Sequence, residues 1–596
     1  MTGTDEMGAV LTPDGVRFRV WAPHAVGVTV AGDWNAWSPD TDALIPEDGG
    51  RFAGLVPGAR TGDRYKLVID TGTRLLWRND PYAKAVTHSA GESIVCDPAF
   101  DWDDDRYQTP PWHELVIYEL HVGTFNDAPG GGPGSFASVE RRLGHLRGLG
   151  VNAIELMPSA EFGKDFSWGY NPAQIFAIEE AYGGPVALKR LIRAAHAAGI
   201  AVILDVVYNH FGPADLDLWR FDGWDENGKG GIYFYNDERS RTPWGDTRPD
   251  YGRPEVRRYL ADNARMWLEE FRCDGLRWDA TSYIRNVDGN DGDPAGDIPE
   301  GWRLFQEITT DTDRRQPWKL HIAEDLRSNP HLTRPVGDGG AGFDTQWDAG
   351  FVHPVRAALI AGADEQRSME TLRLAVSHHT YGDALRRVIY TESHDEVANG
   401  HSRVPEEIAP GHAANLWAQK RSTLGAVLVL TSPGIPMLFQ GQEILEDQWF
   451  RDEDPIDWSK EHTHAGILLM YRDLIHLRRN VAGITRGLCS HNVNVHHVND
   501  TDKVIAFHRW ERGGPWDDVI VVVNLANRSY DGYRIGLPRP GAWQVRFNSD
   551  WRGYSPLFDD HPSYATNADP LPADGMGWSG ALGLGRYAAV ILSQDQ

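Results

Sequence analysis

The middle of the chain alternates between unbroken apolar runs and helical patterns. The apolar runs, which read as strands buried on both faces, cover 115–120, 151–157 and 200–204. Between them, apolar residues recur at helical spacing over 143–149 and 185–198. Alternating strands and helices of this kind predict a parallel sheet. The rhythm continues to about residue 480, and roughly 370 residues of it fit a (β/α)8 barrel with insertions better than a doubly wound sheet.

Both ends of the chain have a different pattern. Residues 16–21 and 26–30 are short alternating segments separated by turn residues, which predicts an N-terminal β-sandwich. An acidic stretch, Asp101 to Pro111, reads as a linker. Strand patterns return near the C-terminus at 504–507, 519–524 and 587–592, which predicts an antiparallel β domain.

The predicted organisation is therefore a β-sandwich at 1–107, a barrel at 108–485 and a β domain at 486–596. Within the barrel region, about 211–251 lacks clean periodicity and is rich in Gly, Asp, Trp and Tyr. We interpret it as a long loop excursion after a strand, and loops of this length are usually functional.

Composition excludes several classes of partner. The 596 residues carry 58 Lys and Arg against 85 Asp and Glu, a net charge of −27, which argues against a nucleic acid or an anionic membrane surface. No apolar stretch is long enough for a transmembrane helix, and the first residues lack a signal pattern. Three cysteines in this length do not make a disulfide framework. We expect a cytoplasmic enzyme; the sequence carries no signal for its oligomeric state.

Four of the predicted strands run into polar clusters, which are 205–210, 277–279, 324–325 and 392–395. The carboxyl ends of barrel strands carry the chemistry of this fold. One such cluster on its own is more often a buried ion pair or a helix cap. Four clusters, each with a carboxylate and most with Arg or His, and no basic phosphate cradle, suggest chemistry at an acetal carbon.

These four clusters resemble the signature regions of glycoside hydrolase family 13, the α-amylase family, and the resemblance covers Trp112 to about Arg479. It implies that Asp279 is the nucleophile, Glu324 the general acid/base, and Asp395 the carboxylate that stabilises the transition state.

The same resemblance implies a set of sugar-binding residues, which are Arg277, His394, Asp205 and His210, with Tyr170 as the aromatic platform under the reacting sugar. Asn209 matches a position that often binds calcium in this family, but no matching loop ligands can be identified, so we predict no metal. No organic cofactor is implied, because carboxyl groups suffice for this acid/base chemistry.

Elementary chemistry agrees with these roles. Retention at an anomeric carbon needs a nucleophilic carboxylate and a second carboxyl about 5–5.5 Å away. Arg277, two residues before Asp279 on the same strand, can share its face and favour its ionised form. Glu324 must keep its proton, which calls for a raised pKa. Asp325 points to the opposite face of the strand from Glu324 if the strand continues. Asp395 can stabilise electrostatically the positive charge that develops in the transition state.

The N-terminal region resembles the family 48 carbohydrate-binding module that precedes the barrel in branching, debranching and trehalose-releasing enzymes, through 18–23, 32–35 and 80–82. The run 392–397 resembles bacterial branching enzymes, whereas the spacing over 244–257 and the compact length resemble maltooligosyltrehalose trehalohydrolases. We favour an α-1,4-glucan branching enzyme and keep the trehalohydrolase as the alternative. A non-catalytic glucan-binding protein is a remote alternative, because it would be expected to have lost one of the three carboxyls.

A neutral glucan should be held by aromatic stacking and hydrogen bonds. The candidate rings are Trp168, Tyr170, Trp219, Trp224, Tyr233, Tyr235 and Trp244, and each could equally be buried inside its own loop. We interpret His196 and His353 as ordinary structural or surface histidines. Glu155 is either a polar residue at the barrel end or part of the substrate rim, and it is given no role.

Overall fold

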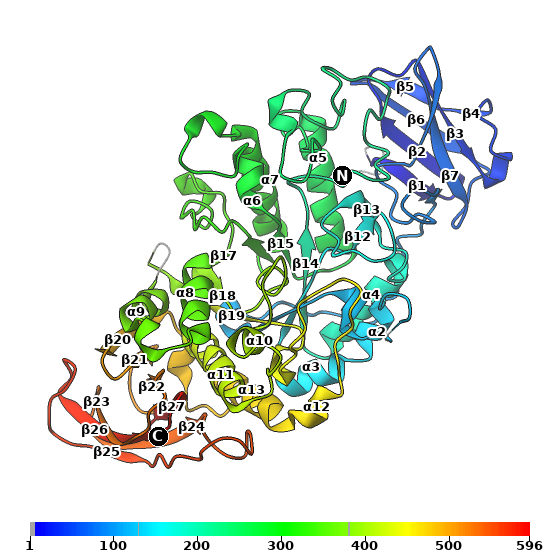
Figure 1. Ribbon diagram of the computed structural model, residues 1–596. Coiled ribbons are helices and arrows are strands. Elements are labelled where there is room, and N and C mark those ends of the chain that lie inside the picture. The colour runs from blue at the N-terminus through cyan, green and yellow to red at the C-terminus, as the bar shows by residue number, and fades with distance from the viewer. Residues whose placement is uncertain (1–5, 129, 379–381, 596) are drawn as a thin grey trace.

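The computed structural model in Figure 1 describes residues 6–128, 130–378 and 382–595. Its centre is a closed barrel of eight parallel strands, paired in the order β10-β11-β14-β15-β16-β17-β18-β19. The strands are β10 (Ile117–Leu120), β11 (Ala153–Leu156), β14 (Ala201–Val206), β15 (Gly275–Trp278), β16 (Leu320–Ala323), β17 (Thr345–Trp347), β18 (Arg387–Ile389) and β19 (Ile435–Phe439). The predicted barrel is confirmed.

Helices cover the outside of the barrel (Figure 1). The longer ones are α4 (Gly184–Ala197), α5 (Pro254–Arg265), α7 (Pro299–Arg315), α8 (Ala349–Ile360), α9 (Met369–Ser377), α11 (Leu416–Thr431) and α13 (Ala465–Arg478). The shorter ones are α1 (Val122–Phe125), α2 (Phe136–Glu140), α3 (Leu143–Leu149), α6 (Thr281–Arg285), α10 (Val404–Ile408) and α12 (Lys460–Thr463). Helix α4 shows why such segments fold: Pro185 starts it, and Leu188, Leu191 and Ala195 form its buried stripe.

A hairpin that the sequence pattern did not predict follows β11. Strands β12 (Ala160–Phe162) and β13 (Pro172–Ile178) pair antiparallel. Every residue of β13 is buried, so it lacks the alternation by which half-buried strands are recognised. The hairpin matters because its connecting segment carries Trp168 and Tyr170 to the cleft described below.

The N-terminal β domain has two antiparallel sheets. The first contains β1 (Gly8–Thr12), β2 (Gly15–Trp21), β6 (Arg51–Val56) and β5 (Ile45–Glu47). The second contains β4 (Asp42–Ala43), β3 (Gly27–Gly32), β7 (Arg64–Asp70) and β8 (Leu75–Arg78), with β9 (Ser93–Ile94) paired to β7. Val16, Phe18 and Val20 of β2 are buried in the hydrophobic core, as the predicted alternation requires.

The loop excursion joins this N-terminal domain to the barrel. Asp222 accepts hydrogen bonds from the backbone N–H of His24 at 3.0 Å and from its ring at 2.9 Å. Trp224 stacks on the same ring, with centroids 4.7 Å apart. Asp217 accepts from the backbone N–H of Asn79 at 2.7 Å. The excursion is therefore packed structure, not a free flap.

The C-terminal domain lies at the opposite end of the molecule from the N-terminal sheets (Figure 1). Its main sheet runs β20 (Asn492–Asn499), β21 (Val504–Trp510), β22 (Val519–Asn524), β27 (Ala588–Ser593), β24 (Gly541–Asn548) and β25 (Thr566–Ala568). A second pair is β23 (Tyr530–Leu537) with β26 (Trp578–Leu584). Lys420 of α11 contacts Asp550 of this domain at 2.6 Å. Among the helices described, none has the length and apolar character needed to span a membrane.

Candidate active site

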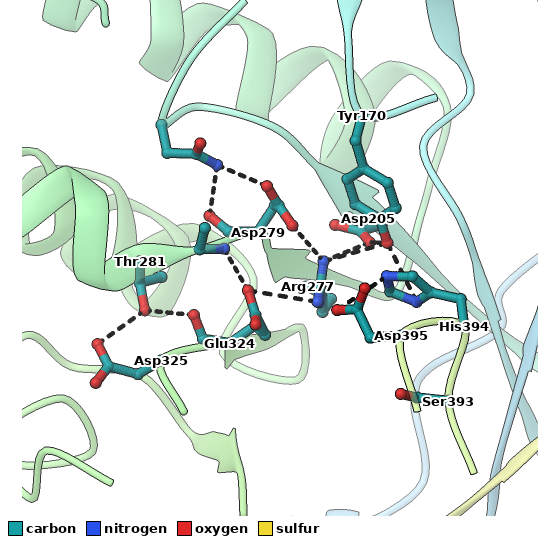
Figure 2. A network of polar contacts seen from close by, with 12 residues as sticks. Tyr170, Asp205, Arg277, Asp279, Thr281, Glu324, Asp325, Ser393, His394 and Asp395 are labelled. Carbon is teal, nitrogen blue, oxygen red and sulfur yellow. Dashed lines mark hydrogen bonds and ion pairs between the residues drawn. The ribbon is translucent and has the colours of Figure 1, made fainter. Parts of the chain in front are cut away.

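The carboxyl ends of the barrel strands open into a cleft of about 1070 Å³. Asp279, Glu324 and Asp395 all line it, although they come from three different strand ends. Figure 2 shows their side chains gathered around Arg277. Closure of the barrel therefore brings together three residues that are spread over more than a hundred positions of the chain.

Arg277 is the buried cation at the centre of this group. On β15, its Nη1 lies 2.6 Å from Asp205 Oδ2 and 3.0 Å from Asp279 Oδ1. Its Nη2 lies 3.5 Å from Glu324 Oε2. The guanidinium also packs over the ring of Trp347 at 4.3 Å, a cation–π contact. One guanidinium thus touches three carboxyl groups (Figure 2).

Asp279 follows β15 directly and is held from both sides. Arg277 contacts its Oδ1, and the side-chain amide of Asn209 donates to its Oδ2 at 2.7 Å. Asn209 also donates to the Asp279 carbonyl at 2.9 Å. The next residue, Ala280, has a φ of +42°, which is strained for a residue with a Cβ. The neighbours and the backbone together fix the direction of this carboxylate.

Glu324 follows β16 and is buried. Its Oε2 accepts a hydrogen bond from the backbone N–H of Ala280, so the carboxyl sits beside the residue that follows Asp279. Burial raises its pKa to about 8; Arg277 opposes this rise, while Asp279 and Asp395 add to it. Glu324 is therefore protonated at neutral pH and can donate a proton.

Asp395 is the more accessible carboxyl, with 44% of its side chain exposed. Its Oδ2 lies 3.5 Å from Nε2 of the buried His394. Burial lowers the pKa of His394, but Asp395 and Glu119 outweigh that effect and bring it to about 9. The imidazole is thus positively charged at neutral pH.

Tyr170 lies against this histidine. Its ring stacks on His394 with centroids 4.9 Å apart and an interplanar angle of 24°. Its hydroxyl donates to Asp205 Oδ2 at 2.6 Å. Burial raises the pKa of Asp205 to about 7, an effect that Arg277 opposes. The ring of Tyr170 forms part of the cleft wall.

His210 contributes a neutral imidazole to the cleft wall. Burial lowers its pKa to about 4. Its Nδ1 pairs with Asn209 Oδ1 at 2.5 Å, and its Nε2 has no hydrogen-bond partner among the described residues. Trp244 covers its ring, with centroids 4.5 Å apart. This nitrogen is itself buried, although the residue lines the cleft.

Of the eight predicted site residues, six line the cleft, namely Tyr170, His210, Asp279, Glu324, His394 and Asp395. Arg277 and Asp205 lie behind that wall and hold it together through their contacts. Asp325 also reaches the cleft wall, but its carboxylate is committed to Arg285, with contacts of 2.9 Å from Nε and Nη2.

The seven candidate aromatic residues divide into two groups. Trp168, Tyr170 and Trp244 line the cleft. The other four, Trp219, Trp224, Tyr233 and Tyr235, are absent from the cleft wall as the described residues form it, and they pack instead within the excursion or against the N-terminal domain. These rings complete the apolar core of the excursion, which is why they are not free to contact sugar.

Sequence reasoning passed over three residues of the site. Trp449 is an exposed ring on the cleft rim, and Tyr283 of α6 lies on the cleft wall. Glu119 is the third of the four residues of β10, and it is hydrogen-bonded to His394. Glu119 stands one residue before the end of its strand, as Asp205 does on β14, so a rule that included the last two residues of each strand would also have found it.

The residues that were given no catalytic role have definite places. His196 is buried between Asp105 and Asp274, at 2.8 and 2.9 Å, where it fastens the linker to the barrel. His353 is exposed on the cleft rim, 3.0 Å from Glu396. Glu155 is buried on β11, with neither carboxyl oxygen hydrogen-bonded to any described residue.

In the part of the chain that the structure describes, no group of three or more His, Cys, Asp or Glu side chains is arranged to hold a metal ion. Three carboxyl groups face the cleft: Asp279 and Glu324, which both contact Arg277, and Asp395 nearby. Glu324 is the one that is protonated. This set can attack, protonate and stabilise positive charge at a single carbon.

Comparison with known proteins places the chain in a family. Residues 120–218 and 220–468 match the α-amylase catalytic domain, which is more than half of the chain. The chain belongs to the α-amylase family. Residues 6–83 match carbohydrate-binding module 48, the isoamylase N-terminal domain, and residues 495–595 match the α-amylase C-terminal all-β domain. This member of the α-amylase family is an α-glucan-active enzyme.

Two relatives extend over most of this α-amylase family member. The 1,4-alpha-glucan branching enzyme GlgB of Corynebacterium jeikeium is 30% identical over 568 residues, covering 91% of this chain and 77% of that protein. The corresponding enzyme of Frankia casuarinae is 32% identical over 586 residues, covering 92% of this chain and 68% of that protein.

Solved structures share the fold. Pullulanase type I from Bacillus subtilis, complexed with maltose, has a TM-score of 0.76 at 21% identity, covering 99% of this chain and 85% of that chain. A mutant pullulanase from Paenibacillus barengoltzii, complexed with maltotetraose, has a TM-score of 0.77 at 21% identity, covering 99% and 95%.

Proposed function

We propose that the protein is a 1,4-α-glucan branching enzyme, which cleaves an α-1,4 bond through a covalent glycosyl–Asp279 intermediate and transfers the cleaved chain to a 6-hydroxyl. The observation that carries the proposal is the meeting of Asp279, protonated Glu324 and Asp395 in one cleft, with the first two on the same guanidinium. A double displacement at an anomeric carbon requires a nucleophilic carboxylate and an acid/base carboxyl group of this kind.

In the first displacement, the Asp279 carboxylate attacks C1 of the glucose whose bond is to be cleaved. The C1–O4 bond breaks, and Glu324 gives its proton to the departing O4. Arg277 and Asn209 hold the two oxygens of Asp279 in a fixed direction, so little reorganisation is needed as the attack proceeds.

The sugar passes through an oxocarbenium-like state that carries positive charge. Asp395, open to the cleft, stabilises that charge, and His394 binds the sugar beside it. Tyr170 supplies an apolar face for the ring, and His210 contributes to the cleft wall around it. The electrostatic interactions of buried groups with the sugar are strong, because the local dielectric constant is low.

In the second displacement, Glu324 is a carboxylate and removes the proton from the 6-hydroxyl of an acceptor glucan. The acceptor oxygen attacks C1, the ester bond to Asp279 breaks, and Glu324 is protonated again. Water in place of the acceptor would give hydrolysis. The choice between branching and hydrolysis therefore depends on which nucleophile occupies the acceptor side of the cleft.

Two observations favour branching over trehalose release. Both relatives described above are named as branching enzymes and align over more than 90% of this chain. The run from Glu392 to Val397 also has the form seen in bacterial branching enzymes. Neither the motif nor the relatives favour the trehalohydrolase.

A two-substrate assay tests this choice. With amylose, we expect the iodine colour to fall, new α-1,6 linkages to appear by proton NMR, and few reducing ends to form. With maltooligosyltrehalose, we expect no free trehalose. Trehalose from the second substrate without α-1,6 linkages from the first would overturn the proposal in favour of the trehalohydrolase. Many reducing ends without α-1,6 linkages would mean simple hydrolysis.

A substitution tests the nucleophile. Asp279→Asn keeps the shape of the side chain but removes its charge, and we expect turnover of amylose to fall by about 10⁴-fold or more, as for other catalytic nucleophiles. The matched control is Asp531→Asn, which makes the same change at a fully exposed aspartate of the C-terminal domain and should leave turnover unchanged. Full activity in the Asp279→Asn variant would refute the assignment.

A further inference from the structure

The structure assigns a positioning role to Glu119: it clamps His394, which follows a strand two positions away around the barrel, and keeps the second ring nitrogen of His394 protonated and aimed at Asp395. The inference rests on the proposed function, since it concerns the same reaction. Glu119 is the third of the four residues of β10, whereas His394 lies in the loop after β18, 275 positions later in the chain. The two residues do not belong to the same helix or strand, so the hydrogen bonds of the Glu119 carboxylate are what connect them.

The clamp uses both oxygens of one carboxylate. Glu119 Oε1 lies 2.5 Å from His394 Nδ1, and Oε2 accepts from the backbone N–H of His394 at 3.2 Å. The first contact fixes the ring and the second fixes the main chain from which the ring projects. Both residues are buried, so these charge-assisted contacts are not weakened by water.

The clamp determines what the other ring nitrogen can do. Since Nδ1–H donates to Glu119, a neutral imidazole would present a bare Nε2 lone pair to Asp395. His394 Nε2 lies 3.5 Å from Asp395 Oδ2, an arrangement that is attractive only when Nε2 also carries a proton. The Glu119 carboxylate favours that doubly protonated state by its charge.

Glu155, the neighbour of Glu119, serves as the internal comparison. The two residues are paired in register on adjacent strands β10 and β11. No described residue donates a hydrogen bond to either oxygen of Glu155, and burial, followed by the charge of Glu119, raises its pKa well above the usual range. Glu155 thus has no described hydrogen-bond partner, whereas both carboxyl oxygens of Glu119 are engaged by His394.

Rings hold the imidazole in place on its remaining sides. Tyr170 stacks on one face, Trp168 meets it edge-on at 5.9 Å, and Trp347 lies at 6.0 Å. The titratable and charged groups around it are Glu119, Glu155, Asp395, Arg277, Tyr170 and His121. Glu119 is the one among them that contacts both the ring and the backbone of His394.

The test is the pair Glu119→Gln and Glu155→Gln, the same substitution at two adjacent buried positions. Glu119→Gln removes the charge, and we expect kcat to fall by about 10²-fold, the cost of a misplaced catalytic group, with KM changed less than about threefold. Glu155→Gln replaces a neutral group with another of equal size and should change kcat by less than about threefold. Thermal unfolding and circular dichroism establish that each variant is folded.

A double-mutant cycle separates positioning from a general structural role. In a His394→Gln background, Glu119→Gln should produce no further loss, because the group through which it acts is already gone. α-Maltosyl fluoride keeps residual turnover measurable in the slow variants. An equal loss in both backgrounds would overturn the inference, as would unchanged kcat in Glu119→Gln or an equal loss in Glu155→Gln.

A spectroscopic readout does not depend on activity. Nitrogen-15 NMR of the His394 imidazole, assigned by its absence in His394→Gln, should show both nitrogens protonated at pH 7.5 in the native protein and not in Glu119→Gln. Identical spectra in the two proteins would overturn the inference. Failure of the native protein to act on any α-glucan would instead refute the proposed function, so the two failures are distinguishable.

Discussion

Arg277 and Lys420 are both buried cations surrounded by acidic side chains, but one lies at the cleft and the other at a domain interface. Arg277 contacts Asp205, Asp279 and Glu324 beneath an open cleft. Lys420, on α11, contacts Asp550 at 2.6 Å and Asp559 at 2.8 Å where the barrel meets the C-terminal domain.

The difference lies in the balance of charge. Arg586 joins Lys420 by pairing with both oxygens of Asp559, at 2.7 and 2.8 Å, so two cations meet two carboxylates. At the cleft, one cation meets three carboxyls, and burial holds the pKa of Glu324 at about 8. Balanced charge fastens two domains, whereas an excess of buried carboxyls leaves one of them holding a proton for chemistry.

Removal of the cleft cation should have the largest effect. In Arg277→Met, three carboxyls lose their common partner, and Asp279 loses the charge that orients it. We expect kcat/KM on amylose to fall by about 10³-fold or more, equivalent to about 4 kcal/mol. Steady-state kinetics, with the folded fraction measured by circular dichroism, checks this. Activity within tenfold of the native protein would show that the cluster does not depend on its cation.

Removal of the interface cation, Lys420, should reduce the stability of the fold and leave the catalytic rate unchanged. Lys420→Met leaves Asp550 buried without its partner, and we expect the free energy of unfolding to fall by about 3–5 kcal/mol. Denaturant titration measures the loss, and kcat per folded molecule should stay unchanged. The control is Lys229→Met, which breaks a partly exposed pair with Asp246 and should cost about 0–1 kcal/mol. Equal losses in the two variants would remove the distinction between buried and exposed pairs.

The pH dependence of activity should reveal the unbalanced cluster directly. Glu324 has its pKa raised to about 8, so it holds the proton needed for the first displacement below that pH and loses it above. We expect kcat/KM to fall through about pH 8, by about tenfold per unit at higher pH. A profile of kcat/KM against pH tests this. A flat profile up to pH 10 would contradict the assignment of Glu324 as the acid.

The interface should respond to acid instead, with a smaller effect. Hydrogen bonds from Arg586 and Lys420 hold the pKa of Asp559 below its usual range. Its stabilisation is therefore present above the unfolded pKa of about 3.9 and is lost as the pH falls below it. Since 34% of the Asp559 side chain is exposed, Asp559→Asn should cost only about 1 kcal/mol at pH 7. The difference from the native protein should shrink at pH 3; an unchanged difference would contradict this.

Much of the fold follows from local pattern. Fully buried and mostly apolar runs such as Ile117–Leu120 and Ala201–Val206 are strands because both faces are covered, and the helices between them carry a single apolar stripe. The hairpin of β12 and β13 was missed, because β13 is buried on both faces and has no period of its own. Helix α5 passes into a π-helical turn at Met266–Glu270, a change of winding that the spacing of apolar residues does not reveal.

The sequence by itself determined which residue types stand at the strand ends, since polarity after an apolar run is a local property. On that basis, and with the family resemblance, Asp279, Glu324 and Asp395 could be selected together. It did not determine which partners those residues meet. Glu119 reaches His394 only because the barrel closes, and Trp219 and Tyr233 turn into a core while Trp244 faces the cleft. Contacts across a closed sheet join positions hundreds of residues apart, and no periodicity along the chain encodes them.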